Sequence, residues 1–343
     1  MTEEWKLEQI RKEKLERRVL RRRLISVIIV IAVMLVSIGL IYSWHIGSRD
    51  RIEKLVFAYQ DRGADAASII AIEMGFFEME GIKVEGKRFT SGPECTQALI
   101  SGAADIGTMG DTAAIVTVAN QGENFHIIAS HGSGEHRHRI IVHKDSAKED
   151  LSDLEGQRIA VRKGTSTYGG LLSLSERHGL DLSEEMIDLS PSLQLPALES
   201  GEVDAIVASE PTPSMAEFKG FGRELATLGG LNNTYPILLV VNVSYGQENP
   251  ERVVAFLRGI ERAVNFIEEN PQDSARILAN ISGLPEEVVE RSMVFHDIQL
   301  VMDRQTMQSL DSMAQFLVMQ SSISKQPDFD TVVDTGYLEE LRR

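Results

Sequence analysis

The sequence has very little cysteine: Cys95 is the only one in 343 residues. A single thiol cannot form an intramolecular disulfide, and metal or redox motifs built from several cysteines are excluded as well. Stability must therefore come from the packing of apolar side chains. These make up 43% of the chain beside 25% charged residues, which is typical of a globular protein long enough for two domains.

Basic charge is also scarce. Asp and Glu number 51 against 35 Lys and Arg, for a formal net charge of −16. Nucleic-acid binding needs a basic face, so this composition argues against nucleic acid as a partner. The first 50 residues reverse the balance, because Lys and Arg outnumber Asp and Glu there. The acidic excess therefore belongs to the remainder of the chain.

Charged residues are missing altogether from one long apolar run, Leu24 to Tyr42. As a helix of about 19 residues it would reach roughly 28 Å, close to the thickness of the hydrocarbon core. The basic residues before it place the N-terminus in the cytoplasm by the positive-inside bias. No A-x-A-like cleavage site and no cysteine for lipid attachment directly follow it. The sequence therefore predicts an uncleaved signal anchor, which crosses the cell membrane once and leaves the bulk of the chain on the extracytoplasmic side.

From Ile52 onward, β-rich runs such as LVFAY, IKVEGKRF and ADIGTM alternate with helical stretches. This alternation is typical of βαβ units and predicts an α/β fold with parallel strands. The pattern A-L-x-S-G-x-x-D at residues 98–105 recurs at residues 197–204. It arises either from two equivalent lobes or from chance similarity of two helix ends, each closed by glycine. If the lobes are equivalent, Asp111 aligns with Glu210, each just beyond a strand.

Two apolar runs, RIIVH from Arg139 and PILLVVN from Pro236, are interpreted as hinge crossings between the lobes. The first lobe is then discontinuous, and the helical stretches after Pro250 cover its back. Residues 1–23 are interpreted as a basic cytoplasmic segment, either a solvated helix or one in contact with anionic lipid headgroups. The predicted divisions are 1–23, the anchor at 24–42, lobe 1 at 52–140 and 240–320, lobe 2 at 141–239, and a C-terminal tail at 321–343.

Four segments carry a family resemblance: AIEMGFFEMEGIKVE, ALISGAADIGTMGDTAA, DLEGQRIAVRKGTSTYG and ALESGEVDAIVASEPTP. In order and spacing they resemble the sulfonate/nitrate/taurine family of ABC-transporter substrate-binding proteins, which includes binders of thiamine-pyrimidine precursors. The resemblance covers about Leu55 to Thr212, with a looser likeness to about Asp303. It implies a two-lobed periplasmic-binding-protein fold (type II-like) and an ABC permease with its ATPase as partners. The membrane anchor departs from relatives that are freely soluble or lipid-modified.

The strongest local candidate for ligand binding is the turn after the strand QRIAVR. Glycines and hydroxyls at a helix start present unpaired backbone N–H groups and the positive end of the helix dipole, which favour an anion. The same residues also serve simply as helix caps, and the resemblance favours ligand contact. A phosphate-binding P-loop is excluded because its lysine is missing. The candidates at this turn are Gly164, Thr165, Ser166, Thr167 and Tyr168.

The first lobe offers equivalent turns at strand ends, where open α/β sheets place their ligands. Asp111 and Glu210 would repel a purely anionic ligand if both face the cleft, which favours a ligand that also bears a cationic group. Asp111 alternatively caps the following helix. The candidates are Gln60 and Asp61 with the adjacent Arg62, then Ser91 and Gly92, then Gly110, Asp111 and Thr112, and in the second lobe Glu210.

Four histidines, His131, His136, His138 and His143, cluster just before and within the first hinge strand. Nothing else at metal-ligand spacing accompanies them, so neither a metal nor a cofactor is predicted. Arg137 and Arg139 alternate with these histidines and are weaker candidates for contact with an anion.

The predicted function is capture of a small sulfonate, nitrate-like or zwitterionic solute by closure of two lobes, for delivery to the permease. The chain is expected to act as a monomer, without covalent chemistry. Two alternatives stay open. Relatives with this shape include a pyrimidine synthase and chorismate-type dehydratases, but no nucleophile–base pair is recognisable here. A sensor is the other alternative, although the cytoplasmic segment is too short for a signalling domain.

Overall fold

The computed structural model describes residues 34–37, 54–182 and 186–343. Most of the expected anchor at residues 24–42, and all of residues 1–23, lie outside the described residues. Only Met34 to Ser37 are described there, and they are helical and exposed. No described helix is both long enough and apolar enough to cross a bilayer. Residues 55–343 form one compact unit.

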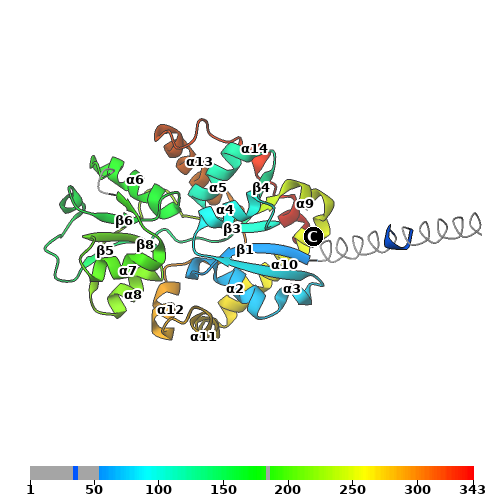
Figure 1. The fold of residues 1–343 in the computed structure, drawn as a ribbon, viewed down its shortest axis with the longest axis horizontal. Coiled ribbons are helices and arrows are strands. Elements are labelled where there is room, and N and C mark those ends of the chain that lie inside the picture. Colours follow the sequence, from blue (N-terminus) through cyan, green and yellow to red (C-terminus); the bar gives the residue numbers. More distant parts are fainter. Residues whose placement is uncertain (1–33, 38–53, 183–185) are drawn as a thin grey trace, which may run out of the picture. The chain divides into compact units, whose positions relative to one another are not determined.

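Two five-stranded sheets organise this unit (Figure 1). The first has the order β2-β1-β3-β10-β4. Its strand β3 runs parallel to β1, whereas β10 is antiparallel to both of its neighbours. The strands are β1 (Lys54–Gln60), β2 (Lys83–Phe89), β3 (Ile106–Gly110), β4 (Phe125–Gly132) and β10 (Ile237–Asn242).

Helices cover both faces of the first sheet. On one face Phe57 of β1 packs against Phe256, with ring centroids 4.7 Å apart, and Phe77 stacks on Phe256 at 4.9 Å. On the other face Leu99, Ile115 and Leu317 join a second buried cluster. The helices are η1 (Gly63–Asp65), α2 (Ala66–Glu73), α3 (Phe76–Met79), α4 (Gly92–Ile100), α5 (Asp111–Gln121), α9 (Val243–Glu248), α10 (Pro250–Glu269), α11 (Pro271–Ser282), α12 (Glu286–Met293), α13 (Arg304–Met319), α14 (Phe329–Val332) and α15 (Gly336–Leu341).

The second sheet has the order β7-β6-β8-β5-β9 and is also covered on both faces. Leu171 and Leu174 of α6 pack in one buried cluster, and Leu198 of α7 packs with Ala216 of α8 in another. The elements are β5 (His138–His143), η2 (Leu151–Leu154), β6 (Ile159–Val161), α6 (Ser166–His178), β7 (Met186–Asp188), α7 (Pro191–Glu199), β8 (Ala205–Ser209), α8 (Thr212–Phe218) and β9 (Gly222–Thr227).

The interpretation of RIIVH and PILLVVN as hinge crossings was wrong. They form β5 and β10, each an antiparallel strand between two neighbours inside its own sheet. Both are buried along almost their whole length because helices cover both faces of each sheet. The chain passes between the sheets just outside these strands, at residues 133–137 and 228–236. We call these stretches the first and second crossings.

Residues 321–343, expected as a tail, contain helices α14 and α15. Phe329 and Val332 belong to the buried cluster that also holds Ile127 of β4, and Val333 forms a bridge with Ile127. Leu338 joins the cluster on the opposite face of the first sheet. This segment therefore contributes to the core.

Candidate functional site

A cavity of about 360 Å³ lies where strand ends from the two sheets meet. Strands β1, β6 and β8 all point their carboxyl ends toward it, because β6 and β8 are parallel and Asp61 and Arg62 directly follow β1. The polar and charged residues that line it are Gln60, Asp61, Arg62, Thr90, Ser91, Arg162, Thr165, Thr167, Ser192, Gln194, Ser209, Glu210, Thr212 and Ser282. Apolar residues complete the wall, among them Leu195, Val207 and Leu284.

Six of the thirteen predicted site residues line this cavity: Gln60, Asp61, Ser91, Thr165, Thr167 and Glu210. Gln60 is buried and donates from Nε2 to the Thr108 carbonyl at 3.4 Å. Thr165 is the N-cap of α6, where its Oγ1 accepts from the Tyr168 amide at 3.3 Å. Thr165 therefore both caps helix α6 and lines the cavity.

The other seven are not among the residues that line the cavity: Gly92, Gly110, Asp111, Thr112, Gly164, Ser166 and Tyr168. Several of them lie where helix α5 of the first sheet contacts helix α6 of the second. A methyl group added to Gly110 would overlap Ser166 Oγ, and one added to Gly169 would meet Thr112 Oγ1 at 2.6 Å. The start of α5 therefore packs directly against the start of α6.

Asp111 is fully buried and its carboxylate is already used. Its Oδ1 accepts from the Thr112 amide at 2.6 Å, and its Oδ2 accepts from Asn233 Nδ2 at 2.7 Å. Asn233 belongs to the second crossing. Asp111 therefore connects α5 to this crossing and does not present its charge to the cavity.

Glu210 lines the cavity, but Arg139 compensates its charge. Arg139 Nη1 donates to Glu210 Oε1 at 2.8 Å, and the Ser214 amide donates to Oε2 at 3.3 Å. The same guanidinium pairs with Glu217 and Glu224. Burial raises the pKa of Glu210, and the hydrogen bond from Arg139 opposes that shift. Two free carboxylates in the cleft would have favoured a ligand that bears a cationic group. Because Arg139 already pairs with Glu210, Glu210 does not require such a group on the ligand.

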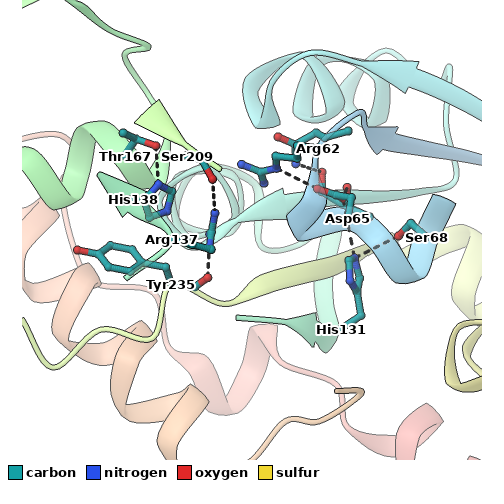
Figure 2. Close-up of polar contacts among 11 residues, drawn as sticks. Arg62, Asp65, Ser68, His131, Arg137, His138, Thr167, Ser209 and Tyr235 are labelled. Carbon is teal, nitrogen blue, oxygen red and sulfur yellow. Dashed lines mark hydrogen bonds and ion pairs between the residues drawn. The ribbon is translucent and has the colours of Figure 1, made fainter. Parts of the chain in front are cut away.

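Two arginines that line the cavity each keep one buried guanidinium nitrogen without a hydrogen-bond partner among the described residues. Arg62 donates from Nε to Asp65 Oδ2 at 2.9 Å, which leaves its buried Nη2 without a partner among the described residues. Arg162 pairs through Nη1 with Asp188 at 3.2 Å, which leaves its buried Nε equally unpartnered there. Figure 2 shows the ion pair between Arg62 and Asp65. One acceptor balances these donors in part, because Asp61 Oδ1 is also buried without a partner in the described chain.

Sequence reasoning missed several lining residues. Arg162 and Ser209 end the strand runs QRIAVR and VDAIVAS, so their position at a strand end was the available signal. Gln194 lies on α7, one of the segments with the repeated pattern. Leu284 follows α11, far along the chain, and no local pattern marks it.

The histidine cluster divides on folding. His131 and His138 are fully buried, whereas His136 and His143 are not. Across residues 54–182 and 186–343, no group of three or more His, Cys, Asp or Glu side chains is arranged to hold a metal ion. Arg139, a weaker candidate for an anion, binds the three glutamates instead.

The chain is similar in sequence to a known family and to known binding proteins. A family model described as NMT1/THI5 like matches residues 65–274. A putative aliphatic sulfonates-binding protein of Bacillus subtilis (strain 168) is 28% identical over 278 residues, which are 79% of this chain and 83% of that protein. The taurine-binding periplasmic protein of Escherichia coli (strain K12) is 27% identical over 239 residues, 67% of this chain and 73% of that protein.

A solved structure shows the same architecture. The alkanesulfonate-binding protein from Xanthomonas axonopodis pv. citri, bound to MOPS, superimposes with a TM-score of 0.76 at 25% identity, covering 82% of this chain and 98% of the other. The predicted two-lobed periplasmic-binding-protein fold is therefore confirmed, and so is the resemblance found in the sequence. The relatives named here are binding proteins and not enzymes.

Proposed function

We propose that this chain, which belongs to the NMT1/THI5-like family, is the solute-binding component of an ABC importer. Its ligand is a small organic anion, and alkanesulfonates are the first candidates because binding proteins for sulfonates and taurine are among its relatives. Binding requires capture and release only, with no covalent step.

The observation that carries this proposal is the pair of free guanidinium N–H groups at the cavity. Arg62 Nη2 and Arg162 Nε lie at the ends of β1 and β6, in different sheets, and both lack a partner in the described chain. A buried N–H without an acceptor costs free energy, which an anionic ligand would recover through charge-assisted hydrogen bonds. The sulfonate oxygens are acceptors of this kind.

The remaining wall indicates an organic ligand. Leu195, Val207 and Leu284 line the same cavity as the two arginines. An alkyl group would bury apolar surface there at roughly 25 cal/mol per Å². Inorganic nitrate or sulfate gains nothing from this part of the wall, so we expect both to bind more weakly than an alkanesulfonate.

Isothermal titration calorimetry of the purified full-length chain in detergent tests the proposal. The panel is nitrate, sulfate, taurine, an aminopyrimidine and the alkanesulfonates from methanesulfonate to hexane-1-sulfonate. We expect saturable binding of at least one alkanesulfonate, with sulfate and nitrate weaker. The absence of heat from every alkanesulfonate and from taurine would contradict the proposal.

The binding mechanism follows from the two sheets. We propose that lobe 1, built on the first sheet with residues 54–132 and 237–343, and lobe 2, built on the second sheet with residues 138–227, close about the two crossings and enclose the ligand. Small-angle X-ray scattering with and without the bound alkanesulfonate should show a smaller radius of gyration with ligand. An unchanged radius at saturating ligand would contradict closure.

We also propose that residues 24–42 anchor the chain in the membrane, with the binding lobes outside and a permease and ATPase as partners. The support is the uncharged apolar run and the basic segment before it. After cell fractionation, the full chain should stay in membranes washed with sodium carbonate. A variant that lacks residues 24–42 should not, and equal retention of both would contradict the anchor.

A further inference from the structure

Arg137, a residue outside the cavity wall, lies directly behind one of its hydroxyl groups. It is the last residue of the first crossing, immediately before β5. Because β5 runs antiparallel to β8, the start of β5 meets the carboxyl end of β8, and His138 is paired with Ser209 in the register. The Glu210 amide likewise donates to the Arg137 carbonyl at 2.9 Å. The sheet register therefore places a cation next to the end of β8, where Ser209 and Glu210 line the cavity.

The guanidinium makes two hydrogen bonds. Nη1 donates to Ser209 Oγ at 2.9 Å, and Nη2 donates to the Tyr235 carbonyl of the second crossing at 2.9 Å. Figure 2 shows Arg137 between these two groups. The side chain is fully buried, and its Nε has no partner among the described residues.

Arg137 differs from the other buried or half-buried arginines near the cavity. Arg62, Arg139 and Arg162 each pair with a carboxylate. For Arg137, no carboxylate of the described residues lies within 4.0 Å of the guanidinium nitrogens, and Asp111 and Asp65 act on it only from farther away. Burial, assisted by the charge of Arg62, lowers the pKa of Arg137 to about 9, so it stays protonated at neutral pH. A buried cation of this kind gains from any anion that enters the cavity.

The direction of the Arg137–Ser209 hydrogen bond is unambiguous. A guanidinium has only donors, so Ser209 Oγ must accept. A serine hydroxyl carries one proton of its own, and that proton is left to point elsewhere. Since Ser209 lines the cavity, this O–H is available to an acceptor on the ligand, and the cation behind it strengthens it as a donor.

We infer that Arg137 is a positioning residue for ligand binding: it orients the Ser209 hydroxyl as a hydrogen-bond donor toward the anionic group of the ligand. The inference rests on the proposed function, since it assumes an anionic solute in this cavity. It adds a third donor to those of Arg62 and Arg162. It also explains why a cation is buried at the crossing without a carboxylate beside it.

The next residue repeats the arrangement. His138 is fully buried and shares a hydrogen bond of 2.8 Å between Nδ1 and Thr167 Oγ1, and Thr167 also lines the cavity. Arg137, the last residue of the first crossing, and His138, the first residue of β5, thus each hydrogen-bond to a hydroxyl group of the cavity wall (Figure 2).

A double-mutant cycle tests the inference. The affinity for propane-1-sulfonate is measured by calorimetry for the wild type, R137M, S209A and R137M/S209A. We expect each single change to weaken binding about tenfold, the size of one charge-assisted hydrogen bond. The double variant should be about as weak as either single variant, because Arg137 acts through Ser209. Independent losses that multiply to about a hundredfold would overturn the inference.

Conservative variants separate this role from a purely structural one. R137K keeps the charge and can still donate to Ser209, so it should recover most of the affinity that R137M loses, but only while Ser209 is present. If R137M does not fold, R137Q takes its place in the cycle, because glutamine also removes the charge. S209T keeps a hydroxyl and should bind better than S209A. An R137K variant that binds no better than R137M would also overturn the inference.

The outcomes also separate this inference from the proposed function. If the wild type binds no member of the alkanesulfonate series, the function fails and the inference falls with it. If the wild type binds and the cycle shows no coupling between Arg137 and Ser209, the function stands and only the inference is lost.

Discussion

At the residue scale, position along a strand decides which arginine lines the cavity. Arg158 precedes β6 and Arg162 follows it, so the same strand carries an arginine at each end. Both form ion pairs, Arg158 with Asp204 at 2.9 Å and Arg162 with Asp188 at 3.2 Å. Only Arg162 lies at the carboxyl end, where it lines the cavity and keeps an unpartnered N–H among the described residues.

The first prediction uses this pair. R162M should weaken alkanesulfonate binding by roughly 10- to 100-fold, because a hydrogen bond to a charged group is worth about 1.5–3 kcal/mol. R158M is the matched control, and its affinity should equal that of the wild type. Calorimetry with propane-1-sulfonate measures both. Equal losses in the two variants would show that overall charge, and not position, controls binding.

A second prediction at this scale concerns Arg139, which is 4% exposed. R139M would leave Glu210 buried without its cation, and Glu217 and Glu224 would lose theirs. Breaking a buried ion pair from one side costs about 3–5 kcal/mol of unfolding free energy, which urea denaturation measures. R158M again serves as the control because its ion pair is half exposed. A loss under 1 kcal/mol for R139M would contradict the assigned role.

At the element scale, the starts of helices α5 and α6 pack so closely that an added methyl group on Gly110 would overlap Ser166. The three atoms nearest to a methyl group placed on Gly110 all belong to Ser166. Gly110 has φ of −70°, so other residues adopt its backbone conformation without strain. Only the approach of the two helices therefore requires glycine at this position.

This contact leads to the third prediction. G110A and G110V should oppose closure progressively, and G110V should weaken alkanesulfonate binding by about tenfold or more, because ligand binding must then supply the energy of the closed state. Closure is proposed to bring α5 against α6 only in the liganded form, so the melting temperature of the unliganded protein should change little. Calorimetry and scanning calorimetry measure the two effects. A G110V variant that binds as tightly as the wild type would show that this contact is not part of the bound state.

At the scale of the whole molecule, two buried histidines make stability depend on pH. Burial lowers the pKa of His131, with partial opposition from Asp65, and lowers that of His138 well below its usual value. The folded state therefore binds fewer protons than the unfolded state below pH 6.5. The stability that these two histidines contribute is fully present above their unfolded-state pKa of about 6.5. It is lost as the pH falls toward their lower folded-state pKa values.

The fourth prediction follows from this direction of the pH dependence. Between pH 7.5 and 5.5 each histidine should cost at most about 1.4 kcal/mol of unfolding free energy. Urea denaturation at both pH values should show the loss, and H131Q or H138Q should reduce it because glutamine does not titrate. H178Q, at an exposed position, is the control. Constant stability over this range would contradict the prediction.

The described part of the chain shows which inferences local pattern supports. The alternation of β-rich and helical stretches predicted an α/β fold because side-chain periodicity is a local property. The turn at Thr165 was recognisable as a helix start for the same reason. Ser91 and Thr167 were found as cavity residues because strand ends in α/β sheets meet at one edge.

The charge distribution, the single cysteine, the α/β alternation and the strand-end positions of the candidates were all determined by the sequence alone. Tertiary structure alone decided that β10 joins the first sheet, that β5 lies between β8 and β9, and that Arg137 therefore stands behind Ser209. It also brought Leu284 to the cavity and turned Asp111 away from it. These outcomes depend on contacts between residues far apart along the chain, and periodicity within one segment carries no information about them.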